Sequence, residues 1–411
     1  MKQILLAGVS LAMLSGAPAI AGNDGWGGPV DLGNGVTLDP IADMRLRYEH
    51  VEQASQARDA NALTMRLRAG ADLRAGDFSL LVEGESTLAI VQDYNAFAFV
   101  APKQNRPYPV VADPENIELN RAQIAWQRDG YNITLGRQRI NLDDQRWVGA
   151  VGWRQNEQTF DALRGTARLG PLSLDASYAI SQRTMFGIDA GPRQAYDGHF
   201  IFAAAGLAAG PVNIKGFAYL LDYDWVVMQA SSTQTYGALA TGSVPFGTDM
   251  KLSFKASYAR QSDWKANARN FSADYHALEA TVSGRGVAIT GGYELLGSDK
   301  GTAVSTPMAT LHKFNGWADI FSNTPANGLR DLYAGASYTF PATTPVRGLN
   351  ASVTWHDFRS DSGGVHYGSE WDASLGFRLG PVTLLAKYAD YNAKGFAADT
   401  RKFWLQAEYG F

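Results

Sequence analysis

Apolar and polar residues alternate along much of this chain. From Ala42 to Glu49 every second residue is apolar and the residues between them are charged. A period of two places successive side chains on opposite faces of an extended strand. The same alternation recurs over residues 63–73, 172–180, 250–258, 371–377 and 382–388. These segments predict strands with one apolar face and one polar face.

Short clusters of turn-forming residues separate the strand segments. They lie at residues 75–77, 128–130, 169–171, 209–211, 246–248, 284–286, 344–348 and 379–381, and longer polar segments, such as 90–115 and 298–329, lie between them. Eight tight turns join sixteen strands, and the first and last strands of the chain raise the number to eighteen. Composition alone, with 43 glycines and 11% aromatic residues, would also fit a soluble β-solenoid. The amphipathic strands of about ten residues instead predict an all-β fold, an 18-stranded antiparallel transmembrane β-barrel with short periplasmic turns and long extracellular loops.

The two ends of the chain place this barrel in the outer membrane of a bacterial cell. Residues 1–21 have the basic start, short apolar run and small-residue ending of a secretory signal peptide, so the barrel is expected over residues 22–411. The final strand alternates from Phe403 to Phe411 and resembles the insertion signal of outer-membrane proteins, which implies contact with the barrel-assembly machinery. Cysteine is absent, so stability must come from strand pairing and burial. The outward face is expected to contact outer-membrane lipid and lipopolysaccharide.

Function is expected from the polar face, which lines the lumen. The early strands place there Arg45, Arg47, Arg66, Arg68 and Arg121, with Glu83 and Glu85 among their acidic counterparts. The later strands add Lys215, Lys251, Lys255, Asp372, Arg378 and Lys387. Cations along the lumen would attract an anion, while scattered acids would keep it from binding too tightly. The alternative is structural, with rows of arginines paired to acids in the wall of a water-filled pore.

The stretch from Gly136 to Arg164 fits neither a strand nor a helix period over its whole length. It carries Arg137, Arg139, Arg146, Arg154, Asp161 and Arg164 as further candidate pore-lining residues. The strand count makes it the end of the fifth strand, a loop that we expect to enter the lumen, and the start of the sixth strand. Parity would point Arg137 and Arg139 toward lipid unless Gly136 forms a β-bulge or the two arginines lie above the hydrocarbon.

This stretch, GRQRINLDDQRWVGAVGWRQNEQTFDALR, and the later segments STPMATLHKFNGWADIF and TPANGLRDLY resemble signature segments of the alginate export family of bacterial outer-membrane porins. The resemblance implies a monomeric eighteen-stranded barrel with an arginine-rich constriction. It also implies passive diffusion of an anionic polysaccharide or oligosaccharide, that is, of alginate-like uronic acids. The alternative function is a general diffusion porin for small hydrophilic solutes.

Other classes of protein have little support in the sequence. The six histidines have no metal-ligand spacing and accompany no nucleophile elbow, so we expect no enzyme, no metal and no cofactor. The sequence has no phosphate-binding loop and no basic patch outside the barrel pattern, so nothing in it indicates a nucleic-acid partner. The expected partner is an anionic carbohydrate.

Overall fold

The computed structural model describes residues 28–101, 106–342 and 346–410. The predicted signal peptide and the terminal Phe411 lie outside the described residues. The strands are β1 (Val30–Gly33), β2 (Val36–Gln53), β3 (Ala60–Ala75), β4 (Phe78–Asp93), β5 (Asn116–Arg128), β6 (Tyr131–Gln138), β7 (Thr159–Leu169), β8 (Leu172–Arg183), β9 (Ala195–Ala209), β10 (Val212–Tyr223), β11 (Thr233–Phe246), β12 (Met250–Asp263), β13 (Ser272–Gly284), β14 (Val287–Leu296), β15 (Ser298–Asp299), β16 (Thr302–Ala303), β17 (Leu329–Thr339), β18 (Val346–Arg359), β19 (His366–Leu379), β20 (Val382–Ala393) and β21 (Thr400–Gly410). Three short 3-10 helices are η1 (Ile188–Gln194), η2 (Val226–Ser231) and η3 (Leu311–Lys313).

The long strands form one closed antiparallel barrel. Each strand from β2 to β14 pairs with the next, β14 pairs with β17, and the series continues to β21. The last strand then pairs with the first over Asp43–Gln53 of β2, which closes the sheet. The barrel therefore has eighteen strands, as the turn count predicts. In the described part of the chain, no helix is long and apolar enough to cross a membrane.

One strand lies outside the predicted pattern. The short strand β1 pairs with the first residues of β2, where Val30 faces Leu38 and Asp31 faces Thr37. At this height β21 has already ended, because its pairing with β2 begins at Asp43. β1 therefore extends the sheet beyond the barrel proper.

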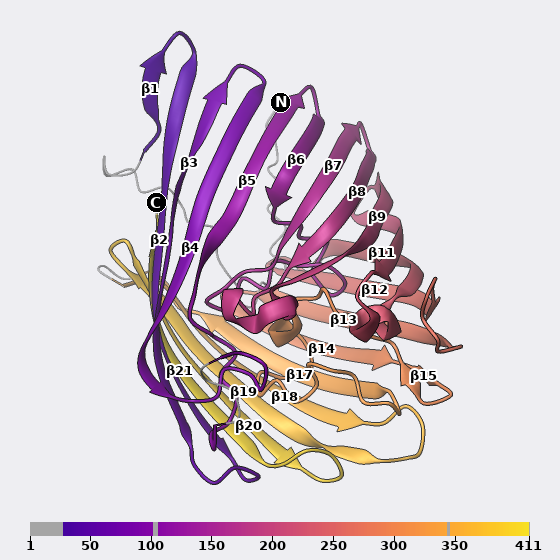
Figure 1. The fold of residues 1–411 in the computed structure, drawn as a ribbon. Coiled ribbons are helices and arrows are strands. Elements are labelled where there is room, and N and C mark those ends of the chain that lie inside the picture. The colour runs from indigo at the N-terminus through magenta and orange to yellow at the C-terminus, as the bar shows by residue number, and fades with distance from the viewer. Residues whose placement is uncertain (1–27, 102–105, 343–345, 411) are drawn as a thin grey trace.

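The connections differ in length at the two ends of the barrel (Figure 1). The tight turns at one end fall where the sequence predicts them, with one adjustment near residue 344. There β18 already begins at Val346, so the chain reverses between Thr339 and Val346, and residues 343–345 are outside the description. Nine longer connections lie at the other end, and the longest run over residues 94–115, 139–158 and 297–328.

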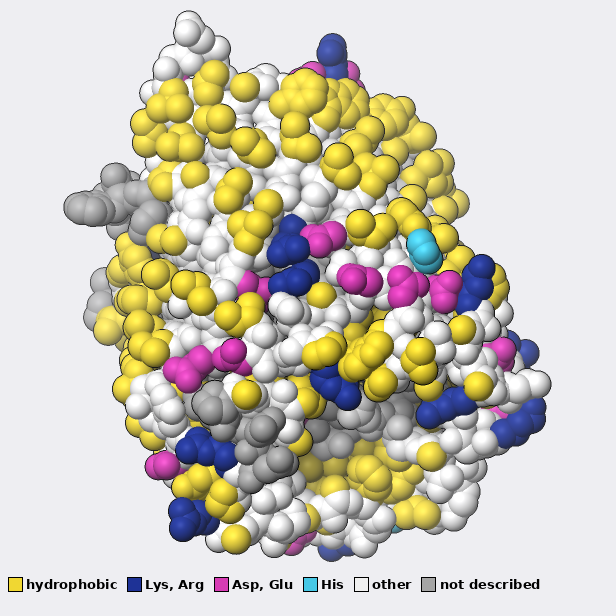
Figure 2. Space-filling view, viewed as in Figure 1, with side chains coloured by type: hydrophobic (Ala, Val, Ile, Leu, Met, Phe, Trp, Pro, Cys, Tyr) yellow, Lys and Arg dark blue, Asp and Glu magenta, His cyan; other side chains and the backbone are white. Residues whose placement is uncertain are grey.

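The two faces of the wall differ in polarity as the alternation predicts. Met44 and Leu46 on β2 are 46% and 42% exposed, whereas Arg45 and Arg47 between them are 2% and 0% exposed. Figure 2 shows the outer face as a band of hydrophobic side chains, with a row of acidic and basic side chains below it. The apolar side chains of β2 thus face outward toward lipid, and its arginines face the lumen.

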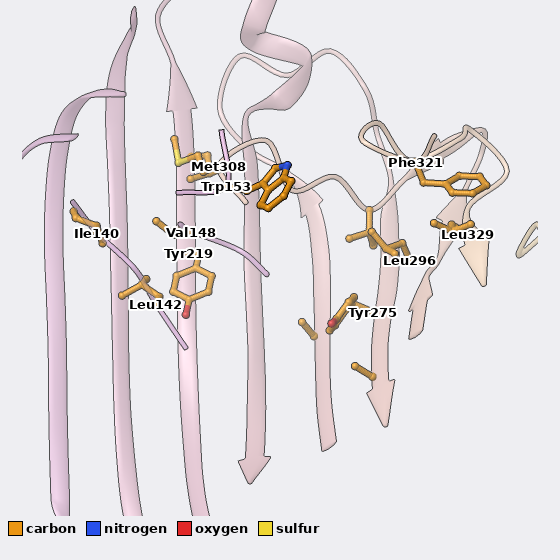
Figure 3. Close-up of a cluster of buried hydrophobic side chains, with 14 of the residues drawn as sticks. Ile140, Leu142, Val148, Trp153, Tyr219, Tyr275, Leu296, Met308, Phe321 and Leu329 are labelled. Atoms are coloured by element: carbon orange, nitrogen blue, oxygen red, sulfur yellow. The ribbon is translucent and has the colours of Figure 1, made fainter. Parts of the chain in front are cut away.

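The lumen is filled in part by two of the long connections, the 139–158 loop and the 297–328 loop. Their apolar side chains pack against inward-facing residues of the wall, and Figure 3 shows Trp153, Met308 and Phe321 in one cluster with the wall residues Tyr219 and Tyr275. The two loops also meet each other, because Val148 forms a parallel bridge with Met308 and the amide of Gly149 donates to the carbonyl oxygen of Met308. They make a shared partition across the barrel.

Candidate functional site

The arginines of β2 hold the 139–158 loop. The Nη1 atom of Arg45 lies 3.1, 3.1 and 3.2 Å from the carbonyl oxygens of Gly152, Trp153 and Arg154. Arg47 donates from Nη2 to the carbonyl oxygen of Trp153, and its guanidinium lies 4.0 Å from the centroid of the Trp153 ring. These two predicted pore-lining residues therefore bind the main chain of the loop inside the barrel.

The arginines of β3 are held by acids. Arg66 forms an ion pair with Asp43 and lies 3.0 Å from Glu408, while Arg68 lies 2.5 Å from Glu85 and 2.7 Å from Glu157. Arg66 and Arg68 are 0% and 5% exposed. Burying charges is tolerated when each is paired, as here. This pairing agrees with the structural alternative for the arginine rows.

Glu83 accepts hydrogen bonds from several side chains near the start of the 139–158 loop. The bulged residue Asn120 and its neighbour Arg121 both turn inward and donate to Glu83 at 2.8 Å. Arg139 donates to Glu83 at 3.2 Å and also pairs with Glu157. Strand β6 ends at Gln138, so Arg139 is free of the strand's alternation and reaches inward. Glu83, Arg121 and Arg139 thus point into the lumen, although strand alternation alone would have turned Arg139 outward.

Arg137 and Asp161 do not lie where the sequence predicted, since both were expected among the pore-lining residues. No bulge occurs at Gly136, because β6 pairs without a register shift from Tyr131 to Arg137 with β5 and from Tyr131 to Gln138 with β7. Gly136 instead has a φ of 115°, and a Cβ atom there would lie 2.3 Å from the carbonyl oxygen of Ala122. Arg137 keeps the outward parity of the exposed Leu135 and forms an ion pair with Asp161 at 2.8 Å. Neither residue lines the lumen in this structure.

The height of this outward pair explains how it is tolerated. Arg137 follows the turn residue Gly130 by seven positions (137 − 130), the same offset at which Tyr178 follows Pro171 and Tyr388 follows Pro381. Tyr178 and Tyr388 are outward-facing aromatic residues, and such girdles mark the edge of the hydrocarbon. Arg137 and Asp161 therefore lie at the membrane boundary, where a charge costs little.

The far end of the 139–158 loop reaches the opposite wall. Asp143 pairs with Lys215 of β10, and Asp144 lies 3.0 Å from Lys255 of β12. These strands lie almost half of the way around the barrel from β2. The loop thus crosses the lumen, with arginines of β2 and β3 at one end and lysines of β10 and β12 at the other.

Acidic side chains of the wall bind the 297–328 loop, and of these only Asp372 was predicted to face the lumen. The amides of Trp317 and Ala318 donate to Asp372 at 3.2 Å and to Glu370 at 2.7 Å. Arg146, from the other loop, lies 2.9 Å from Glu294 of β14. Glu294 and Glu370 lie on the inward parity of their strands, so the alternation could have identified them. The pairing of Arg146 across the lumen has no local signal in the sequence.

Lys387 on β20 fastens both loops to the wall. Its Nζ atom lies 3.9 Å from the ring centroid of Trp153 and 3.7 Å from that of Trp317, which come from different loops. The same atom lies 2.8 Å from Nε2 of His312. A cation over an aromatic face gains about 0.5–1 kcal/mol at an exposed site and about 2 kcal/mol when it is desolvated. Lys387 therefore stabilises the partition at its centre.

Above the partition lies a cavity of about 1020 Å³, here called the vestibule. The long connections and the outer ends of the strands line it. Among the described residues, its lining includes six cations and one acid, namely Arg106, Arg146, Arg154, Arg193, Arg269 and Lys402 with Asp319. Of the predicted pore-lining residues, Arg146 and Arg154 reach this cavity. Arg164 instead faces the lumen on β7 and pairs with Asp175 of β8 at 2.6 Å.

Asp319 is at the centre of the charges on the vestibule floor. Its Oδ2 atom lies 2.7 Å from Arg154 and 2.8 Å from Lys402. Its Oδ1 atom lies 2.8 Å from Nδ1 of His312. In the described part of the chain, no group of three or more His, Cys, Asp or Glu side chains is placed to hold a metal ion. The arrangement offers charged hydrogen-bond donors to an anion.

The closed barrel, the apolar outer face and the loops inside the lumen define a channel of the bacterial outer membrane. A family model described as alginate export matches residues 38–204, which confirms the resemblance seen in the stretch from Gly136 to Arg164. A comparison with curated proteins found no match.

Solved structures of outer-membrane proteins share the fold. The outer membrane protein OpdK from Pseudomonas aeruginosa is 15% identical, with a TM-score of 0.65, and the match covers 91% of this chain and 98% of that chain. Its structure with vanillate is 16% identical over the same shares, also with a TM-score of 0.65. OccAB4 from Acinetobacter baumannii is 12% identical, with a TM-score of 0.69 and coverage of 91% and 98%. At these identities the likeness concerns the fold.

Proposed function

We propose that this protein is a passive outer-membrane channel for anionic oligosaccharides or polysaccharides of the uronic acid type. The observation that carries the proposal is the lining of the vestibule, where six cations face one acid among the described residues. A cavity with walls of one charge concentrates solutes of the opposite charge and speeds their entry. The match of residues 38–204 to the alginate export model supports a carboxylated sugar as the solute.

We place the selectivity of the channel in the vestibule, whereas the sequence placed it in the arginine rows of the strands. Arg45, Arg47, Arg66 and Arg68 are buried and paired with loop carbonyls or acids, so they are not free to bind a solute. Arg154 and Lys402 share one carboxylate and border the open cavity. We therefore assign recognition to the vestibule cations, and we assign support of the partition to the arginine rows.

The test is electrical. The purified protein is inserted into planar bilayers, and the reversal potential is measured in a salt gradient. Anion selectivity and a concentration-dependent block of the current by alginate oligomers are the expected results. Clear cation selectivity would contradict the proposal. Neutral oligomers of the same length are the control and should block less.

A general diffusion porin is the second candidate, and the pairing of the lumenal arginines with acids favours it. In that case alginate oligomers and neutral oligomers would reduce the current equally. Hydrolysis forms no part of either proposal. His312, which lines the vestibule, contacts Asp319 and Lys387, and we give it a role in holding the partition.

We also propose that the barrel works as a monomer and is inserted by the barrel-assembly machinery through its last strand. The alternation of β21 supports the second point, since Leu405 is exposed on the outer face and Trp404 is buried inside. Chemical crosslinking in outer-membrane vesicles would test the first point, because a single band at the monomer mass is expected.

A further inference from the structure

Asp319 has an unusual position for the one acid in the described lining of the vestibule. Its backbone φ is 62°, in the left-handed region that side-chain-bearing residues rarely adopt. Two cations from different parts of the chain converge on its Oδ2 atom, Arg154 from the 139–158 loop and Lys402 from β21. The carboxylate is thus presented to the same donors that border the open cavity.

Arg154 has capacity for a further acceptor. Its residue is 6% exposed, and its Nη1 atom is buried without a hydrogen-bond partner among the described residues. Its Nη2 atom is the one that binds Asp319. An unpartnered nitrogen of a charged group is costly to bury. A solute carboxylate at this place could accept from both nitrogens of the guanidinium fork, as carboxylates commonly do with arginine.

We propose that Asp319 occupies the place of a solute carboxylate, and that an anionic solute displaces it from Arg154 and Lys402 as it passes. This inference rests on the proposed function, because it concerns how the same vestibule handles its solute. The exchange replaces one carboxylate by another, so neither cation is left without a partner at any stage. Unpaired buried charges are the main cost of such a step.

The exchange needs a small movement only. The amides of Trp317 and Ala318, just before Asp319, are fixed to Asp372 and Glu370 on the wall. Asp319 can therefore leave the cations by rotation of its side chain while the 297–328 loop stays in place. A built-in competitor also shortens the time that each carboxylate stays bound, since permeation requires binding that is weak enough to release the solute.

The variant Asp319→Asn tests this inference, with an alginate tetramer as the blocking probe in planar bilayers. Asparagine has nearly the same shape but does not neutralise Arg154 and Lys402. We expect the tetramer to block at about tenfold lower concentration, through longer blocking events. The double variant Asp319→Asn with Lys402→Gln removes one of the released cations and should lose most of this gain. Asp274→Asn removes an acid that pairs with Arg260 outside the cavity, and it should leave the block as in the wild type.

An unchanged or weaker block in Asp319→Asn would overturn the inference. So would a change in open-channel conductance in potassium chloride without a gain in affinity, because that would make Asp319 a structural latch of the loop. A wild-type channel without anion selectivity and without block would instead overturn the proposed function itself. The two failures are therefore distinguishable in the same recordings.

Discussion

Arg47 binds Trp153 twice, once through the main chain and once through the ring. Its Nη2 atom donates to the Trp153 carbonyl oxygen, and its guanidinium lies 4.0 Å from the centre of the indole. Arg47 is on the wall and Trp153 is on a loop inside the lumen, 106 positions later in the chain. This lumenal arginine therefore binds the protein's own loop and is not free to bind a solute.

Replacement of Arg47 by Ala should loosen the 139–158 loop. Removing one partner of a buried charge pair costs about 3 kcal/mol, and Arg47 also pairs with Asp113 at 3.2 Å. We expect a lower midpoint of thermal unfolding by circular dichroism and a larger, noisier single-channel conductance. Arg74→Ala is the matched control, since Arg74 pairs with Asp72 but its side chain is 60% exposed. Equal conductance in both variants would argue against a role for Arg47 in holding the loop.

Gly316→Ala should displace the 297–328 loop from the wall. Gly316 has a φ of 83°, and a Cβ atom there would lie 2.4 Å from a carboxylate oxygen of Glu370. Gly301→Ala on the same loop is the control, because Gly301 has a φ of 74° and open space around a new Cβ atom. The control should lose only the conformational term, about 1 kcal/mol, as measured by thermal unfolding.

Both glycine variants should fold, and only Gly316→Ala should raise the conductance. If Gly301→Ala were as destabilising as Gly316→Ala, the close approach to Glu370 would not be the cause.

The double variant Arg193→Gln with Arg269→Gln should weaken the block by alginate oligomers several-fold. Both residues line the vestibule, and about 0.5–1 kcal/mol of lost attraction corresponds to a two- to fivefold change in affinity. Arg137→Gln is the control, since Arg137 faces outward with Asp161, and its block should stay at the wild-type value. Titration of the oligomer in planar bilayers measures both. A weaker block in Arg137→Gln would restore that residue to the pore.

The block should show no step at pH 6.5, the ordinary pKa of histidine. Burial lowers the pKa of His312 well below 6.5, and its contact with Asp319 does not restore it. Burial by itself would raise the pKa of Asp319, but Arg154, His312 and Lys402 outweigh it and hold that pKa well below 3.8. An acid with a lowered pKa stabilises the folded state above its ordinary pKa and loses this effect only as the pH falls through the lowered value.

His312 should therefore stay neutral, and Asp319 and Arg154 should stay charged, from pH 8 to below pH 6.5. Block constants measured across this range are the test. A step near pH 6.5 that disappears in His312→Gln would show that His312 titrates in the native channel.

The barrel was predictable because its rule is local. Membrane strands must alternate, so Arg45 and Met44 reveal their opposite faces from their positions alone. Glu294 and Glu370 follow the same alternation, so their inward positions can be read from the sequences of their strands. The alternation of β6 also pointed Arg137 outward, although the residue was expected in the pore, and its offset of seven residues from Gly130 places its charge at the membrane boundary.

The partition was not predictable from the same rule. The charges of the 139–158 loop led us to expect it inside the lumen. The residues that it contacts there could not be predicted. The contacts of Trp153 with Lys387 and of Asp144 with Lys255 join residues far apart in the chain. Periodicity reports which face a strand residue takes and says nothing of which loop residue will meet it. The vestibule depends on these long-range contacts, so its lining required the structure.

The loop that crosses the lumen has a mechanical consequence. A wide barrel is a single-layered ring, and lateral pressure from the membrane tends to flatten such a ring into an ellipse. The 139–158 loop connects β2 with β10 and β12, through hydrogen bonds from Arg45 to its main chain at one end and ion pairs with Lys215 and Lys255 at the other. It therefore acts as a diametral tie that resists changes in one diameter, and the width of the passage beside it is set by the length of a loop as well as by the number of strands.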